Sequence, residues 1–363
     1  MKKKFFHFFS VAILGILFVT LSSCFSKGKE PAEADIDVFK SKEVIGFVDS
    51  YMECLFKGEY SKAEAMHLDG NDSFQNVEDN LKIMGWKTEE VSNAVDGAMV
   101  KVMVCKSSKE NVVSILERYD INVEKDNEEY KIKSVKISKE EESFKEGENL
   151  RIRQKNNVKT NLLIDKSGLP QYVYPKDDKE KIKETQISPQ SEFALSAFNY
   201  SGEKIAVSSE DKDAFISIIK IEEDLKVQGK ADDMDKKEKG DSSNDDKNNV
   251  REIPIGKEII PLDIIKDSKI ELLIFSKDEK FLAVQYKDYE GTTRIRCYNS
   301  DSGDIVAEEL VDKFPPDIYD LLFEGFDESN LYLSARAKEY NDVENKVAPV
   351  SVKINLKDFK IEK

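Results

Sequence analysis

The stretch Ile270-Glu-Leu-Leu-Ile-Phe-Ser-Lys-Asp-Glu-Lys-Phe-Leu-Ala-Val284 decides how the larger part of this chain folds. It consists of an apolar run, a short polar turn that contains Glu279, and a second apolar run. Short apolar runs on either side of a polar turn predict two antiparallel strands joined as a hairpin. The stretches 193–207 and 319–333 have the same form, each with a glutamate in its turn. We therefore expect a β domain that is built from repeats.

The polar turns recur at a spacing that is compatible with a propeller blade. Their glutamates, Glu203, Glu279 and Glu328, are separated by 76 and then 49 residues. The first interval contains the stretch 230–250, which is rich in Asp, Lys, Ser and Asn and holds almost no apolar residue. Without that stretch the interval shortens to about 55 residues, close to the period of a propeller blade. We therefore expect a flexible acidic loop at 230–250.

The turn sequences resemble those of a known fold. Ser201-Gly-Glu-Lys-Ile-Ala-Val207 and Lys277-Asp-Glu-Lys-Phe-Leu-Ala-Val284 resemble the hairpins of WD-repeat and Tol-type β-propellers. Arg294-Ile-Arg-Cys-Tyr-Asn-Ser-Asp-Ser-Gly-Asp-Ile-Val306 resembles the outer strand and turn that end such a blade. The resemblance implies an all-β repeat domain over 151–363. Three clear repeats and a fainter β segment at 161–174 are few for a closed ring, so an open stack of β-sheets or an irregular sandwich is the alternative.

The part before this region, 38–138, has a different pattern. Apolar residues recur at steps of three and four between residues 44 and 56, which predicts an amphipathic helix. Residues 77–84 and a stretch that Thr88 could cap predict further helices. From Ala98 onward apolar and polar residues alternate, which predicts strands. Helices followed by an antiparallel sheet indicate an α+β domain.

Two strings in this part resemble a second known fold. Phe56-Lys-Gly-Glu-Tyr-Ser-Lys-Ala63 and Glu129-Tyr-Lys-Ile-Lys-Ser-Val135 resemble the cone-shaped, nuclear-transport-factor-like domains that are common in bacterial lipoproteins. The resemblance implies the cone-like fold only, because no catalytic pair of that family can be identified in the sequence. The acidic stretch 139–150 lacks an apolar pattern and is expected to link the two domains.

The N-terminus has the form of an export signal. Three lysines, Lys2 to Lys4, precede an apolar run from Phe5 to Val19, which is too short to span a bilayer as a helix. Leu21-Ser-Ser-Cys24 resembles the bacterial lipobox, which implies that residues 1–23 are a cleaved signal peptide and that Cys24 carries the lipid, palmitate included. Residues 24–37 are expected to form a tether. The protein is therefore expected on the extracytoplasmic face of the cell membrane, where acyl chains anchor it.

Charge and composition exclude several classes of function. The chain has 56 basic and 72 acidic residues and a formal charge of −16, which argues against nucleic acid as a partner. It has two histidines, and signal cleavage would leave His67 alone. There is no glycine-rich phosphate loop and no zinc motif, so we expect no cofactor and no metal.

Few residues qualify as site candidates. His67 and Asp69 could act as an oriented base or ligand, or His67 could be a surface histidine at a helix end. Cys54 and Cys105 could form a disulfide outside the cytoplasm, or could remain two buried free thiols. No catalytic grouping emerges from these residues.

These observations favour a membrane-anchored lipoprotein that acts as a binding or adaptor protein through its β domain, with a protein partner that the sequence does not identify. The first alternative is a small-ligand-binding protein or enzyme that uses the cavity of the N-terminal domain with His67. The second alternative is a structural protein of the cell envelope.

Overall fold

The computed structural model of this chain describes residues 41–68, 80–94, 97–127, 129–176, 182–222, 252–338 and 348–362. Residues 41–363 cluster as one compact unit, and the description below concerns that unit alone. The signal peptide, Cys24, the tether, Asp69 and the acidic loop at 230–250 lie outside the described residues.

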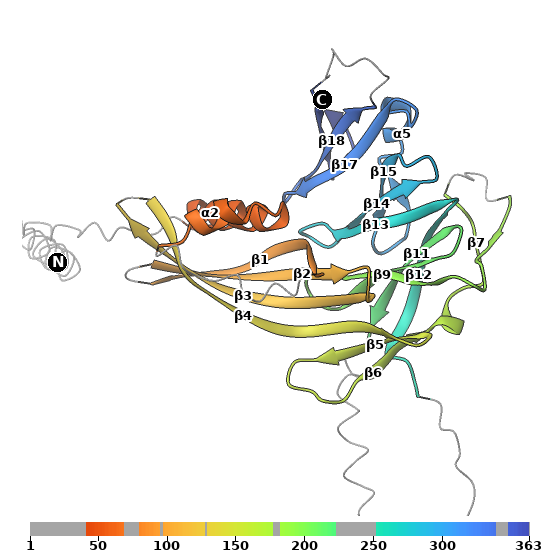
Figure 1. Cartoon of the computed structure of the whole chain (residues 1–363), viewed down its shortest axis with the longest axis horizontal. Coiled ribbons are helices and arrows are strands. Elements are labelled where there is room, and N and C mark those ends of the chain that lie inside the picture. The colour runs from red at the N-terminus through yellow and green to blue at the C-terminus, as the bar shows by residue number, and fades with distance from the viewer. Residues whose placement is uncertain are drawn as a thin grey trace, which may run out of the picture. The chain divides into compact units, whose positions relative to one another are not determined.

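The unit begins with helix α2 (Ser41–Phe56) and the short helix α3 (Tyr60–Ala65). Val44, Val48 and Leu55 are among the residues that α2 buries, at the steps of three and four that the sequence shows. The helix ends at Phe56, and Gly58 just beyond it has a φ of +70°, which is easily adopted only by glycine. Figure 1 shows α2 lying along the sheet that follows, where it contacts β1 and β2. The predicted first helix is confirmed.

A six-stranded antiparallel sheet follows, with its strands side by side in sequence order. Its strands are β1 (Lys82–Ala94), β2 (Gly97–Ser108), β3 (Val113–Asp126), β4 (Glu129–Glu146), β5 (Asn149–Gln154) and β6 (Asn161–Asp165). The segment 139–150, expected as a linker, lies in β4 and β5 of this sheet. The first five residues of the fainter β segment at 161–174 form β6 of the same sheet, and a one-turn 3-10 helix (Lys166–Gly168) follows them.

The rest of the unit contains three four-stranded antiparallel sheets, each a meander of consecutive strands. We call them sheets I, II and III. Sheet I consists of β9 (Glu192–Phe198), β10 (Lys204–Glu210), β11 (Ala214–Ile221) and β12 (Gly256–Ile265). Sheet II consists of β13 (Ser268–Phe275), β14 (Phe281–Asp288), β15 (Thr293–Asn299) and β16 (Ile305–Val306). Sheet III consists of β17 (Tyr319–Phe326), β18 (Asn330–Ala337), β19 (Val350–Asn355) and β20 (Ile361–Glu362).

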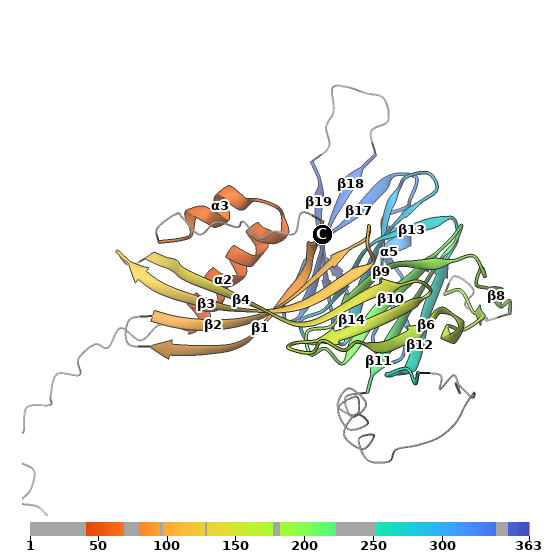
Figure 2. The same ribbon diagram turned by 60° about the horizontal axis from the view of Figure 1, so that its bottom comes forward.

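The predicted hairpins are confirmed as β9–β10, β13–β14 and β17–β18. β13 contacts β9, and β15 contacts β17, so the three sheets stand side by side (Figure 2). Two smaller elements complete the unit, a two-stranded sheet of β7 (Tyr172–Val173) and β8 (Thr185–Gln186), and the one-turn helix α5 (Leu310–Lys313). Repeated four-stranded meanders are the coarse feature that this part shares with propeller blades.

The backbone of the hairpin turns does not make Glu203 and Glu279 equivalent, although the sequence repeat aligns them. Gly202 and Glu279 both have positive φ, +75° and +63°, and both lie two residues before the next strand. The backbone therefore makes Glu279 the equivalent of Gly202. Because a non-glycine residue strains this conformation, side-chain bonds must hold Glu279 in place.

One apolar core connects the six-stranded sheet with sheets I and II. Met84, Met103 and Leu116 of the six-stranded sheet are buried in the same cluster as Phe198 of sheet I and Leu273 of sheet II. A second core lies between sheets II and III. The N-terminal sheet and the β repeats therefore share their interior.

The expected fold class, an α+β domain with distinct helices followed by an all-β domain, is wrong. The described residues are mostly strands, and their α-helices are the three short ones, α2, α3 and α5. The helix expected after Thr88 is part of β1, as are residues 82–84. Helices were expected here because β1 has two register shifts, at Ile83/Gly85 and at Thr88/Glu90. These irregularities shift the alternation of its side chains, so that the strand lacks the period of two that would identify it.

Candidate functional site

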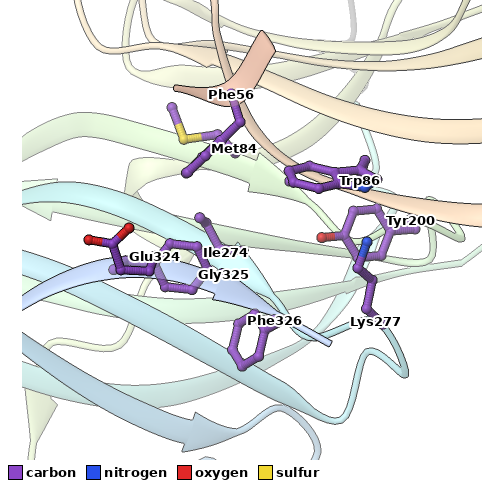
Figure 3. A pocket seen from close by; sticks show the side chains of 11 residues that line it. Phe56, Met84, Trp86, Tyr200, Ile274, Lys277, Glu324, Gly325 and Phe326 are labelled. Atoms are coloured by element: carbon purple, nitrogen blue, oxygen red, sulfur yellow. The ribbon is translucent and has the colours of Figure 1, made fainter. Parts of the chain in front are cut away.

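Two hollows that are lined by described residues are candidate sites. The first, which we call the junction hollow, has a volume of about 20 Å³ and lies where α2 and β1 meet the turns and strands of sheets II and III. Figure 3 shows its aromatic and aliphatic walls together with one ammonium group. Its walls include Phe56, Trp86, Tyr200, Lys277, Phe323 and Phe326.

Trp86 forms part of the wall of the junction hollow. Its indole Nε1 donates a 2.7 Å hydrogen bond to the carboxylate of Asp49 on α2. The ammonium of Lys277 lies 4.4 Å from the centre of the Trp86 ring, a cation–π contact, and 3.6 Å from the same Asp49 carboxylate. Burial lowers the pKa of Lys277, and the charge of Asp49 opposes that effect in part.

A second polar group lies at the adjacent turn. Glu279 accepts hydrogen bonds from Lys87 Nζ at 2.9 Å, from Asn199 Nδ2 at 2.5 Å and from Ser201 Oγ at 2.9 Å. One carboxylate thus joins β1, the turn of sheet I and the turn of sheet II. These bonds hold the positive φ of Glu279.

The side chains of the junction hollow are mainly engaged with one another. The ring of Phe56 lies 6.0 Å from Trp86 and 6.1 Å from Phe323, in tilted and edge contacts. The hydroxyl of Tyr200 donates to the carbonyl of Phe275 at 3.0 Å. We interpret this hollow as a packing junction between elements, because its ammonium already has a carboxylate and a ring as partners.

The second hollow is larger, about 530 Å³, and is open to solvent. We call it the tyrosine groove. One wall is the chain segment from Tyr172 to Lys176, which includes Tyr174 and Pro175. The facing residues come from the edge strands of sheets I and II: Pro261 and Leu262 of β12, and Asp304, Ile305 and Glu308 at and around β16.

Two aromatic rings are exposed in the tyrosine groove. Tyr172 is 51% exposed and Tyr174 is 39% exposed, while Val173 between them is buried. Tyr172 and Val173 form β7, in which successive side chains turn to opposite faces, and both tyrosines line the groove. The two tyrosines are therefore presented on one side of the segment.

The segment that carries the tyrosines is fixed by a buried carboxylate. Asp263 of β12 has no exposed surface, and its Oδ1 accepts the backbone N–H of Lys176 at 2.9 Å. Its Oδ2 accepts hydrogen bonds from Arg296 at 2.5 Å and from the hydroxyl of Tyr298 at 2.7 Å, both in β15. Burial and the nearby charge of Asp263 raise the pKa of Tyr298 well above its usual value. Asp263 thus joins the tyrosine segment to sheets I and II.

Three strand edges border the tyrosine groove. Among the described strands, β7 pairs with β8 alone, β12 is the outer strand of sheet I, and β16 is the outer strand of sheet II. Pro261 lies in β12 and has no N–H to donate, as is common in edge strands.

The structure places His67 away from both hollows. Its side chain is buried, and its Nε2 lies 3.3 Å from the hydroxyl of Tyr51 on α2. The backbone on either side of it pairs with Ile132 of β4. The interpretation of His67 as an exposed histidine at a helix end is therefore wrong.

Cys54 and Cys105 are free thiols in this structure. Cys105 is buried beside Ser114, with 3.7 Å between Sγ and Oγ, and burial raises its pKa to about 11. Among the described residues no group of three or more histidine, cysteine, aspartate or glutamate side chains could hold a metal ion. No described helix is long and apolar enough to cross a membrane.

The tyrosine groove and the residue that supports it are not evident from the sequence. In the sequence, Tyr172-Val-Tyr174 is only the end of the faint β segment at 161–174. Asp263 stands within the apolar run Ile259-Ile-Pro-Leu-Asp-Ile-Ile265, and a lone charge in such a run is a signal of a buried, paired group. Its partners Arg296 and Tyr298 are distant in sequence, so only the fold could identify them.

Comparisons with known proteins identify no family for this chain. No protein-family model and no curated protein matches this chain. A TolB candidate from Agrobacterium tumefaciens matches 76% of this chain and 79% of its own length, with 6% identity and a TM-score of 0.29. A 6-phosphogluconolactonase candidate from Bacteroides uniformis matches the same shares with 9% identity and a TM-score of 0.28. At such TM-scores the likeness carries no argument. The comparisons do not support the resemblance to nuclear-transport-factor-like domains or to the lipobox.

Proposed function

We propose that this chain is a lipid-anchored binding or adaptor protein on the extracytoplasmic face of the cell membrane, and that it holds a partner protein in the tyrosine groove. The observation that carries the proposal is the pair of exposed rings, Tyr172 and Tyr174, in an open hollow of the β part. Tyrosine is among the residues that contribute most to protein–protein binding, since its ring buries a large area at low entropic cost.

The support beneath the rings favours binding over a passive surface. The backbone of Lys176 is bound to Asp263, which is itself bound to Arg296 and Tyr298. A segment that is fixed in this way loses little conformational entropy when a partner binds. The favourable free energy of the ring contacts is therefore offset only slightly by the cost of ordering the segment.

The anchor belongs to the proposal and rests on the sequence alone. The basic start, the short apolar run and Leu21-Ser-Ser-Cys24 favour lipid on Cys24. The net charge of −16 favours a protein partner over nucleic acid.

The binding proposal is tested by site-specific crosslinking in cells. A photoreactive amino acid replaces Tyr172 in the full-length chain, and in a control chain it replaces Tyr289, which is 79% exposed and outside the groove. We expect a protein adduct from position 172, weakened by Tyr174→Ala, and no such adduct from position 289. Equal adducts from both positions, or none from position 172, would contradict the proposal.

The anchor is tested separately by metabolic labelling with palmitate. We expect the natural chain to take up the label and the Cys24→Ala variant to take up none. A natural chain that stays unlabelled would refute the lipid anchor without touching the binding proposal.

A further inference from the structure

We propose that the occupant of the tyrosine groove is an extended segment of the partner protein, with basic and apolar side chains in alternation, that adds as a strand to the free edge of β16. This inference rests on the function proposed above and names the chemistry of the partner.

The strand edges at the groove favour an extended segment. β16 pairs with β15 on one side, Val306 with Cys297 and Ile305 with Tyr298, and no described strand lies on its other side. An unpaired edge of this kind can accept a strand from another chain, whose backbone hydrogen bonds then contribute to affinity. Of the neighbouring edges, β12 is less suited because Pro261 lacks an N–H group.

The charges beside β16 favour basic side chains. Asp304 precedes the strand Ile305–Val306 in the sequence and Glu308 follows it, and both residues line the groove. The ammonium of Lys176 lies 4.0 Å from the carboxylate of Asp304. The side chain of Asp304 is 72% exposed, so it remains accessible to a further cation. The overall charge of −16 would also attract a basic segment over a distance.

The opposite wall favours an amphipathic segment. A strand that is added at β16 would direct alternate side chains to opposite sides. One set would reach the rings of Tyr172 and Tyr174, which can accept either apolar side chains or cations on their faces. The other set would lie near the carboxylates. An acidic segment would meet Asp304 and Glu308 with like charge.

The test measures binding of a labelled peptide to the full-length chain by fluorescence anisotropy. The probe is a seven-residue peptide of alternating lysine and valine. Two matched peptides accompany it, one with glutamate in place of lysine and one with N-methyl groups on all internal backbone amides. We expect the lysine peptide to bind, the glutamate peptide not to bind, and the N-methylated peptide to lose at least about tenfold in affinity, since it cannot complete a strand pair.

Variants of the chain locate the binding. We expect Tyr172→Ala/Tyr174→Ala and Asp304→Asn/Glu308→Gln each to weaken binding by at least about tenfold. Glu64→Gln/Glu89→Gln removes two exposed charges outside the groove and is the matched control, with a change of less than about twofold. Circular dichroism confirms that every variant is folded.

Specific outcomes overturn the inference. If the control variant weakens binding as much as the groove variants do, the peptide senses only the general negative charge. If the N-methylated peptide binds equally well, strand addition is wrong. If position 172 crosslinks a protein in cells but the lysine peptide does not bind, this inference fails and the proposed function stands. If position 172 crosslinks nothing, the proposed function fails whatever the peptide does.

Discussion

Asp263 is the single residue on which the tyrosine segment depends most. It is fully buried, and it accepts hydrogen bonds from Arg296, Tyr298 and the backbone of Lys176. Removing one charge of a buried ion pair leaves the other charge without compensation. We therefore expect Asp263→Asn to lower the free energy of unfolding by about 3 kcal/mol in urea denaturation.

The matched control for this change is Asp301→Asn. Asp301 forms an ion pair with Lys204, but its side chain is 62% exposed, so the pair contributes at most about 1 kcal/mol. If the two variants lose equal stability, the buried cluster does not have the role assigned to it. In the folded Asp263→Asn variant, crosslinking from position 172 should also decline, because Lys176 loses its fixed acceptor.

Gly85 is required by close packing in the junction hollow. A Cβ at this position would overlap the hydroxyl of Tyr200, and that hydroxyl is held by the carbonyl of Phe275. Overpacking of a buried site costs about 1 to 3 kcal/mol, so Gly85→Ala should destabilise the chain by that amount in thermal or urea denaturation.

Two further variants test this explanation of Gly85. Tyr200→Phe removes the hydroxyl that a Cβ would meet, so Gly85→Ala should cost much less in the Tyr200→Phe background. Gly46→Ala, within α2 and with open space around the position, should instead stabilise the chain by up to about 1 kcal/mol. Equal effects of Gly85→Ala in both backgrounds would show that the cause is not the contact with Tyr200.

Lys277 should make stability depend on pH in the alkaline range. Its pKa is lowered from 10.5 in the folded chain because burial disfavours the ammonium, against the charges of Asp49, Glu328 and Asp327. Between the lowered pKa and 10.5 the unfolded chain binds a proton that the folded chain has released, so the contribution of Lys277 to stability rises with pH. The natural chain should therefore gain stability relative to Lys277→Met as the pH rises from 7 to 10. Urea denaturation of both proteins measures this difference, and a difference that stays constant or falls contradicts the prediction.

At the scale of the element, prediction from sequence succeeded where one periodicity ran unbroken. Helix α2 has its apolar residues at steps of three and four, and the β13–β14 hairpin has a polar turn between two apolar runs. β1 was missed because two register shifts interrupt its alternation. The segment 139–150 has the sequence of a linker because its acidic residues form no apolar pattern, yet Glu140 pairs with Arg118 of β3 and Glu142 pairs with Arg153 of β5.

The candidate site was less accessible to sequence reasoning than the elements were. Titratable residues drew attention to His67, Cys54 and Cys105, and the structure leaves these outside both hollows. The tyrosine groove depends on edge strands from different sheets and on a carboxylate whose partners Arg296, Tyr298 and Lys176 are 33, 35 and 87 residues away in sequence. Such contacts are set by the order of sheets, which no local pattern encodes.

At the scale of the whole molecule, the shared core predicts that residues 41–363 unfold together. Leu116 of the six-stranded sheet and Leu273 of sheet II lie in one apolar cluster. Trp86, the single tryptophan of the chain, lies at the junction of α2, β1 and sheets II and III, so its fluorescence reports on that junction. We expect the Trp86 fluorescence and the circular dichroism of the strands to change in one coincident transition.

Substitutions in the two halves sharpen this last prediction. Leu116→Ala and Leu273→Ala should each lower stability by about 2 to 5 kcal/mol, and each should shift both signals by the same amount, because one cooperative unit loses apolar contacts in either case. Val158→Ala, at a fully solvated position, is the control and should shift neither signal. If Leu116→Ala moves the fluorescence transition while the dichroism transition stays in place, the six-stranded sheet unfolds independently and the shared core does not couple the two parts.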